Sequence, residues 1–72
     1  MKDFSERLKE IRTDRKLTQR AVYEALDMRP TVYQRYELGM RKPAFEQLIA
    51  LADFFEVSLD YLVGRSDDPQ RR

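Results

Sequence analysis

The 72-residue sequence contains no cysteine, no histidine and no tryptophan. Without cysteine there is no disulfide and no thiolate chemistry. With histidine also missing, the chain lacks the commonest zinc ligands and the commonest general base. The remaining residues assemble no nucleophile–base pair and no metal-binding cluster. We therefore expect neither an enzyme nor a cofactor or metal site, and the lack of cysteine is compatible with a reducing compartment.

Long hydrophobic runs are missing too. Residues 1–6 carry no apolar stretch of signal-peptide length, and no later segment approaches the roughly 20 apolar residues of a membrane span. We therefore expect a cytoplasmic protein without a membrane partner. With 42% apolar residues, we expect one small core without a small-molecule pocket. The expected domain covers residues 1–65, and a loose polar tail covers residues 66–72.

Charge is unevenly distributed, although the net charge is only +1. Residues 15–42 hold seven basic and three acidic side chains, a net +4, whereas residues 43–72 hold three basic and six acidic ones, a net −3. A basic segment of this kind favours a nucleic-acid partner. The alternative is that these charges form an ordinary solvated helix face.

Capping residues and apolar periodicity together predict an all-α fold of five helices. The residues suited to begin or end helices are Asp3, Thr18, Pro30, Gly39, Ser58 and Gly64. The expected helices cover residues 4–16, 19–26, 30–38, 45–55 and 59–63. Asp27 is expected in a left-handed turn between the second and third helices.

The fourth helix has the strongest periodicity in the chain. Its expected buried face consists of Phe45, Leu48, Ile49, Ala52 and Phe55. Ala44 precedes this helix at the N-cap position, where it offers no oxygen to the free backbone N–H groups. Tyr33 and Tyr36, on the third helix, are expected to pack in the core rather than to act as stacking surfaces.

The second and third helices are joined by only about four residues, which is typical of a helix-turn-helix. In such a motif the second of the two helices enters the major groove of DNA. Here that helix is residues 30–38, and it lies within the basic segment. Spacing and charge therefore point to the same function.

Three blocks of sequence, residues 17–19, 36–43 and 48–62, resemble the lambda-repressor/Cro-type helix-turn-helix regulators of the XRE family. The resemblance covers about residues 4–65. It implies a compact five-helix domain that binds operator DNA, commonly as a dimer on a two-fold symmetric site. This chain departs from the family pattern at four positions around the turn, which are Tyr23, Asp27, Arg29 and Pro30.

The resemblance also implies roles for individual residues. The expected base-reading residues are Thr31, Gln34 and Arg35, and the expected phosphate contacts are Gln19, Arg41 and Lys42. Arg12 and Glu37 match a pair that forms a salt bridge between the first and third helices. Glutamine pairs with adenine, arginine with guanine, and threonine offers a hydroxyl or contacts a thymine methyl. The alternative for Gln34 and Arg35 is an ordinary exposed helix face, and for Thr31 a contact with phosphate or solvent.

The sequence therefore predicts a sequence-specific DNA-binding transcriptional regulator, repressor-like, that binds a double-stranded operator as a homodimer. Residues proposed for dimerisation are Leu59, Tyr61, Leu62 and Val63, which are more apolar than a short last helix requires. The alternative is that these four residues close the core. A second possible function is an antitoxin or adaptor-type protein-interaction module on the same fold.

Overall fold

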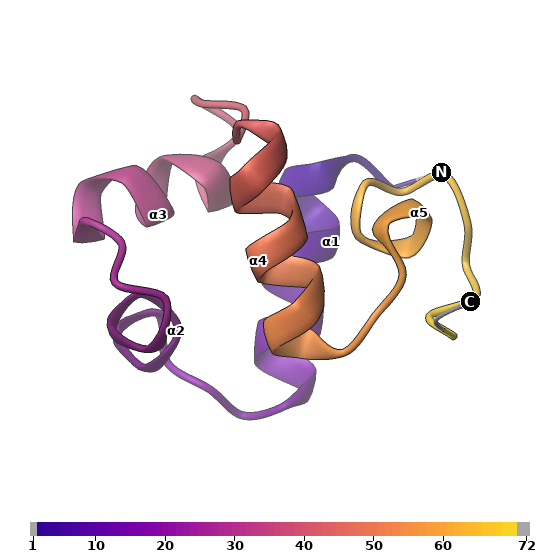
Figure 1. Ribbon diagram of the computed structural model, residues 1–72, viewed down its shortest axis with the longest axis horizontal. Coiled ribbons are helices and arrows are strands. Elements are labelled where there is room, and N and C mark those ends of the chain that lie inside the picture. The colour runs from indigo at the N-terminus through magenta and orange to yellow at the C-terminus, as the bar shows by residue number, and fades with distance from the viewer. Residues whose placement is uncertain (1, 71–72) are drawn as a thin grey trace.

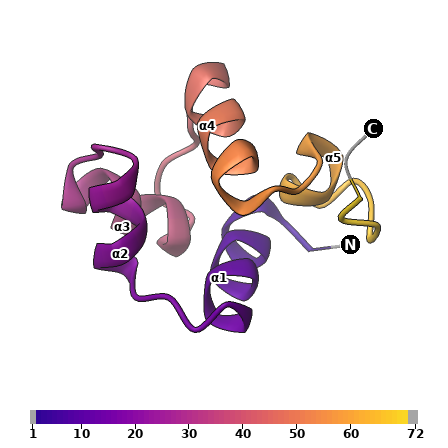
Figure 2. The same cartoon turned by 60° about the horizontal axis from the view of Figure 1, so that its bottom comes forward.

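The computed structural model describes residues 2–70, which form five α-helices and no strand. The helices are α1 (Phe4–Asp14), α2 (Gln19–Ala25), α3 (Pro30–Leu38), α4 (Phe45–Phe55) and α5 (Leu59–Leu62). The α1 helix packs against α3 and α5, and α2 packs against α3. Figures 1 and 2 place α2 and α3 at one end of the molecule, and α5 with both chain ends at the other. The all-α five-helix prediction is confirmed.

Three of the five helices begin at side-chain caps that the sequence predicts. In each case a side-chain oxygen accepts a hydrogen bond from the backbone N–H three residues ahead, at 2.9–3.0 Å. The caps are Asp3 for α1, Thr18 for α2 and Ser58 for α5. Such caps satisfy N–H groups that have no partner within the helix, so the starts of these helices follow from local sequence.

Left-handed residues terminate or connect the helices. Gly39 ends α3 with φ of 75°, Gly64 follows α5 with φ of 84°, and Asp27 has φ of 54° in the turn, as predicted. Lys16 and Glu56 also take φ values near 57° and 56°. Because Lys16 turns the chain back, α1 ends at Asp14, two residues before its predicted end. Gly64 is required for a second reason, since a Cβ atom there would meet the Lys2 carbonyl oxygen at 1.6 Å.

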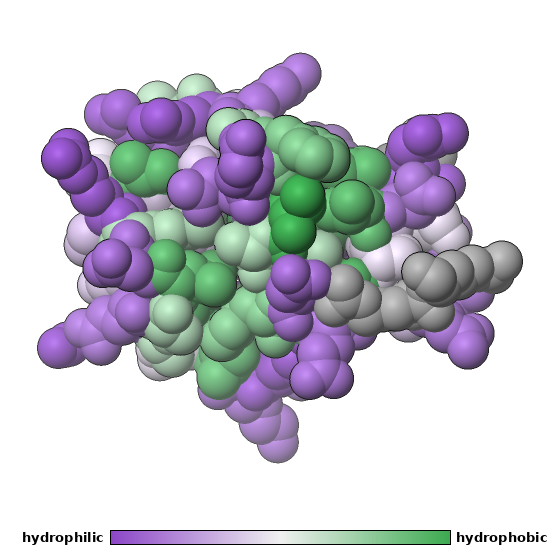
Figure 3. All heavy atoms as spheres, in the orientation of Figure 1, coloured by the Kyte–Doolittle hydropathy of each residue, from purple (hydrophilic) through white to green (hydrophobic). Residues whose placement is uncertain are grey.

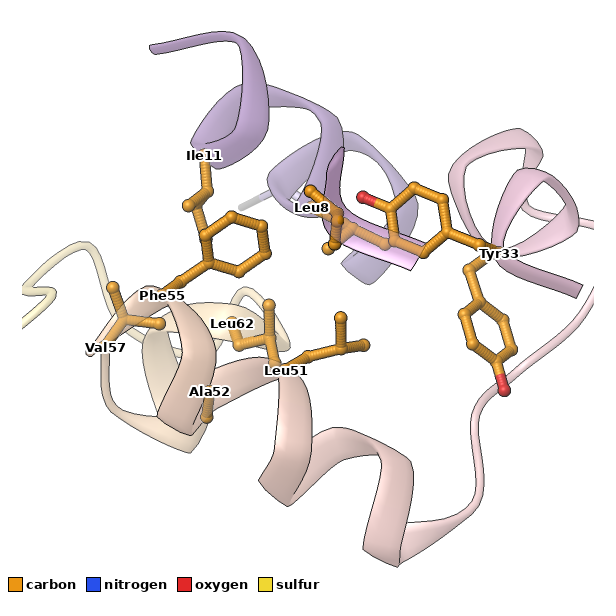
Figure 4. Packing of buried hydrophobic residues seen from close by; sticks show 10 residues of the cluster. Leu8, Ile11, Tyr33, Leu51, Ala52, Phe55, Val57 and Leu62 are labelled. Carbon is orange, nitrogen blue, oxygen red and sulfur yellow. The ribbon is translucent and has the colours of Figure 1, made fainter. Parts of the chain in front are cut away.

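The core draws on all five helices and on Val57 after α4 (Figure 4). Its buried apolar members are Leu8, Ile11, Val22, Tyr33, Tyr36, Leu51, Ala52, Phe55, Val57 and Leu62. The prediction that Tyr33 and Tyr36 pack in the core is confirmed, because they are 0% and 2% exposed. Their burial fixes which side of α3 faces solvent.

The predicted buried face of α4 is wrong at two positions. Phe45 is 65% exposed and Ile49 is 37% exposed, whereas Leu51 is fully buried. The reason is that α4 is apolar on most sides, so two overlapping stripes with helical spacing run along it. The buried stripe runs through Leu48, Leu51, Ala52 and Phe55. Periodicity alone does not choose between the two stripes.

Residues 66–70 contact the body of the domain. The anchor is Arg7, whose side chain is 2% exposed and lies 3.9 Å from the centre of the Tyr61 ring. Its guanidinium donates hydrogen bonds of 3.0–3.2 Å to the carbonyls of Tyr61 and Ser66 and to the carboxylate of Asp67. The Ser58 N–H also donates to the Pro69 carbonyl at 3.1 Å. Arg71 and Arg72 lie outside the described residues.

No helix within residues 2–70 has both the length and the apolar character needed to cross a bilayer. The longest, α1 and α4, have 11 residues each. The same part of the chain also brings together no group of three or more carboxylates that could hold a metal ion.

Ala44 at the N-cap of α4 forms no side-chain cap hydrogen bond. Ala44→Ser is expected to raise the free energy of unfolding by about 1 kcal/mol, because a serine oxygen would accept from an N–H in the first turn. Thermal unfolding followed by circular dichroism measures the change. Ala44→Val is a suitable control, since it adds volume without an oxygen. An unchanged or lower melting temperature for the serine variant would contradict the expectation.

Candidate nucleic-acid interface

The helices α2 and α3 are joined by residues 26–29, which fold into a tight turn. The Met28 N–H donates to the Tyr23 carbonyl at 2.8 Å, and Asp27 takes the left-handed conformation between them. Val22 of α2 is fully buried, so it packs α2 against the core. This arrangement is a helix-turn-helix, with α3 as the helix presented to solvent.

The predicted base-reading residues lie on the exposed face of α3. Thr31, Gln34 and Arg35 are all exposed, and the buried Tyr33 and Tyr36 occupy the opposite side. Positions three and four residues apart lie next to each other on a helix surface, so the three polar side chains form one patch. The patch offers a hydroxyl, an amide and a guanidinium to a partner.

The N-terminal end of α3 departs from the usual capping chemistry. Its N-cap is Arg29, which makes no side-chain cap bond, and Pro30 follows at the first helical position. Proline suits this position because its missing N–H would have had no partner within the helix. The exposed Arg29 adds positive charge where the helix dipole is already positive. An anionic partner such as a phosphate would be favoured there.

Two further cations flank the patch. Arg41 and Lys42 are exposed in the loop between α3 and α4. Across residues 2–70, neither these two nor Arg35 forms an ion pair with an acidic side chain. Their charges are therefore uncompensated within the described part of the domain, as phosphate binding requires.

Arg12 and Glu37 form a two-pronged ion pair between α1 and α3, the pair that the family resemblance implies. The Arg12 Nε and Nη2 atoms donate to the Glu37 carboxylate at 2.6 and 3.0 Å. A third donor, Nη1, bonds the Leu17 carbonyl at 2.8 Å. The side chains are only 12% and 3% exposed. The pair thus fixes α3 relative to α1 from inside the domain.

Gln19 is held by the same carboxylate, a contact that sequence reasoning missed. Its amide Nε2 donates to Glu37 Oε1 at 3.1 Å. The side chain is therefore engaged within the domain. The backbone N–H at the start of α2 has no acceptor within the helix, so it is a donor that a partner could use. No sequence signal marks this contact, because it depends on the packing of α2 against α3.

The ion pair keeps one protonation state near neutral pH. Burial alone would raise the pKa of Glu37, but hydrogen bonds from Arg12 and Gln19 outweigh it, so the pKa of this carboxyl lies below its ordinary value of 4.5. Burial raises the pKa of the neighbouring Tyr33 well above its ordinary value of 10, and the Glu37 carboxylate raises it further. The carboxylate is charged and the phenol neutral when the domain meets a partner at pH 7.

The residues proposed for dimerisation fall into different environments. Leu62 is fully buried, so it closes the core of its own protomer and is not available to a second one. Leu59 is 38% exposed, and Tyr61 and Val63 are partly exposed. The Tyr61 ring also packs on the Arg7 guanidinium. The apolar surface around α5 that a second protomer could contact therefore consists of Leu59 and the exposed parts of Tyr61 and Val63.

Known proteins resemble this chain in sequence and in structure. The sequence pattern of the helix-turn-helix family matches residues 8–62. The Bacillus subtilis HTH-type transcriptional regulator YqaE is 42% identical over 66 residues, covering 90% of this chain and 57% of that protein. The cryptic phage CTXphi transcriptional repressor RstR of Vibrio cholerae is 37% identical over 62 residues, covering 86% and 55%. A crystal structure of a transcriptional regulator from Listeria innocua has a TM-score of 0.80 at 34% identity, covering 86% and 58%.

The chain spans less than 60% of the length of each of these three proteins. The family match nevertheless includes α2, α3 and the loop that carries Arg41 and Lys42. It also includes both members of the Arg12–Glu37 pair that positions α3. On sequence, fold and the geometry of these two helices, the chain belongs to the helix-turn-helix family.

Proposed function

We propose that the chain is a sequence-specific DNA-binding transcriptional regulator that reads the major groove with α3. The observation that carries this proposal is the exposed face of α3, on which Thr31, Gln34 and Arg35 lie together. These side chains are suited to base edges, since glutamine pairs with adenine and arginine with guanine in the major groove. An α-helix with its side chains is roughly 10–12 Å across, so α3 fits a major groove about 12 Å wide.

Groups suited to bind phosphate, on the elements before and after α3, support this placement. The backbone N–H of Gln19 lies at the start of α2 and has no acceptor within the helix, and Arg41 and Lys42 are exposed in the loop after α3. Residues 15–42 carry a net charge of +4, which attracts the DNA backbone before bases are read. In this arrangement the phosphate contacts set the position of the domain, and α3 supplies the sequence information.

A repressor-like role is supported by the name of RstR, which is a transcriptional repressor. We expect this chain to act in the cytoplasm, where bacterial DNA lies. The proposed activity is binding alone. It requires no catalytic group, cofactor, membrane or small-molecule ligand.

Selection of bound sequences from a random duplex library tests the proposal. We expect one preferred motif, arranged as two inverted half-sites about one helical turn apart. Binding should weaken steeply as salt concentration rises, because released counterions accompany each neutralised phosphate. Recovery of unenriched sequences, with binding that does not respond to salt, would contradict sequence-specific recognition.

We further propose that the chain binds its operator as a homodimer. One domain of this size reads about one half-site, which is too little sequence for selectivity. Leu59, with the partly exposed Tyr61 and Val63, provides an apolar contact at the end of the molecule away from α2 and α3 (Figure 1). Sedimentation is expected to give two copies per two-fold symmetric duplex, and fewer for Leu59→Asp. A monomer both at high concentration and on that duplex would refute the dimer.

A second candidate function is a protein-interaction module of the antitoxin or adaptor type. Hydrophobic side chains gather over α4 on the face shown in Figure 3. On the same helix, the Phe45 side chain is 65% exposed. Binding to a nonspecific duplex at low salt separates the two functions. A groove binder with this basic segment should bind with salt-dependent affinity, whereas an interaction module need not bind DNA at all.

A further inference from the structure

Leu38 is an apolar residue on the polar face of α3. Its side chain is 70% exposed, although the other residues on that face are Thr31, Gln34 and Arg35. The four positions follow the spacing i, i+3, i+4 and i+7, so they form one continuous stripe along the helix. Leu38 is therefore placed as the fourth member of the base-reading surface.

The end of α3 that carries Leu38 is held firmly. Gly39 caps the helix in the left-handed conformation, and the Met40 N–H donates to the Arg35 carbonyl at 2.9 Å. The backbone of Gly39 also lies against α1, since a Cβ atom there would be 3.3 Å from the Ser5 hydroxyl oxygen. The position of Leu38 relative to the rest of the stripe is thus set by backbone contacts and not by its own side chain.

The length of the stripe matches a short run of base pairs. Thr31 and Leu38 are seven residues apart, which is roughly 10 Å along a helix that rises about 1.5 Å per residue. Base pairs in DNA are spaced by about 3.4 Å, so the stripe extends along about three base-pair steps. A helix lying in the groove would present Leu38 to a different base pair from the one that meets Thr31.

Leucine has no hydrogen-bonding group, so Leu38 contributes neither a phosphate contact nor a hydrogen bond to a base. In the major groove the natural apolar feature is the C5-methyl group of thymine. We propose that Leu38 is a specificity-determining residue that packs against a thymine methyl at the end of the half-site remote from Thr31. This inference rests on the proposed function, because it requires α3 to lie in the major groove.

Replacing thymine by deoxyuridine tests the contact, since this change removes only the methyl group. Each thymine of the preferred duplex is replaced in turn, and affinities are measured for the wild-type chain and for Leu38→Ala. At one position per half-site we expect uracil to weaken wild-type binding about fourfold, the effect of losing one buried methyl-sized group. At that position the Leu38→Ala chain should bind the thymine and uracil duplexes equally.

Met40→Ala provides a matched control. Met40 is as exposed as Leu38, at 72%, but it lies in the loop outside the stripe. Its replacement should leave the thymine-to-uracil ratio of the wild-type chain unchanged, and so should Arg35→Ala if the two residues contact different base pairs. Because Leu38 is exposed, circular dichroism should show an unchanged fold for Leu38→Ala.

Two results would overturn the inference, and they are distinguishable from failure of the proposed function. One is that every thymine whose replacement weakens binding does so equally in the wild-type and Leu38→Ala chains, and the other is no uracil effect at any thymine. If either result is obtained on a preferred duplex whose binding depends on Arg35, the role proposed for Leu38 is refuted and the proposed function stands. If the library yields no preferred duplex, the proposed function falls and the role of Leu38 falls with it.

Discussion

Arg12→Ala is expected to leave the domain largely unfolded at 25 °C. The substitution strands the Glu37 carboxylate, which is only 3% exposed, without its charged partner. Removing one member of a buried ion pair costs about 3–5 kcal/mol. A domain of this size has only roughly 3–5 kcal/mol of stability in total. Helix content, measured by circular dichroism at about 222 nm during urea unfolding, should show little or no folded baseline.

Two control variants separate the stranded charge from other effects. Arg12→Leu combined with Glu37→Met should be more stable than Arg12→Ala, because it leaves no unpaired charge in the interior. Arg20→Ala breaks the exposed pair with Glu24, whose side chains are 75% and 58% exposed, and should leave the urea midpoint nearly unchanged. A double variant as unstable as Arg12→Ala would show that lost packing, and not charge, is responsible.

A pH titration checks the same ion pair independently. The pKa of Glu37 is lower in the folded domain than its ordinary value of 4.5, so folding favours the charged form. The resulting stabilisation is fully present above that ordinary value and is lost as pH falls through the lower folded pKa. The stability difference between the wild type and Glu37→Gln should therefore shrink below about pH 4.5. A constant difference down to pH 2 or so would contradict a lowered pKa.

The features that sequence predicts well are those with local causes. Asp3, Thr18 and Ser58 cap helices through bonds to residues three positions ahead, and Gly39 ends α3 because glycine takes a positive φ without strain. Lys16 takes the same backbone region without being glycine, so no residue type marks the end of α1. Helix starts were accordingly more predictable than helix ends.

Features with long-range causes were beyond sequence reasoning. The buried face of α4 depends on which of two apolar stripes packs into the core, and the structure buries Leu51 while Phe45 is 65% exposed. The contact of residues 66–70 with the domain depends on hydrogen bonds from Arg7, which lies about sixty residues earlier in the chain and is 2% exposed. Neither outcome is encoded in any short window of sequence.

In the candidate site, too, features with local causes were predictable from the sequence and features with long-range causes were not. The exposed face of α3 was predictable, because burying Tyr33 and Tyr36 forces Gln34 and Arg35 outward on a helix. The engagement of Gln19 by Glu37 was not predictable, since it requires α2 and α3 to be packed first. The family resemblance predicts which positions contact DNA, and the structure shows which atoms of those residues are already engaged within the domain.

Arg35→Ala is expected to weaken binding to the preferred duplex by roughly 1–3 kcal/mol, and binding to a scrambled duplex by much less. Arg35 is exposed on the face of α3 that we propose reads bases, and it has no ion-pair partner among the residues that the structure describes. Its guanidinium is suited to pair with the O6 and N7 atoms of a guanine. The substitution should therefore lower the specificity, measured as the ratio of the affinities for the preferred and the scrambled duplex.

Arg41→Ala is the matched variant, because it removes the same side chain from the loop beside α3 instead of from the helix face. A phosphate contact carries no sequence information, so both duplexes should lose affinity equally and the salt dependence should fall by about one unit of slope. Titrations of both variants on both duplexes at several salt concentrations give the comparison. Equal losses on the two duplexes for Arg35→Ala would mean that Arg35 reads no base. No loss for either variant would remove α3 and its loop from the DNA interface and favour the protein-interaction module.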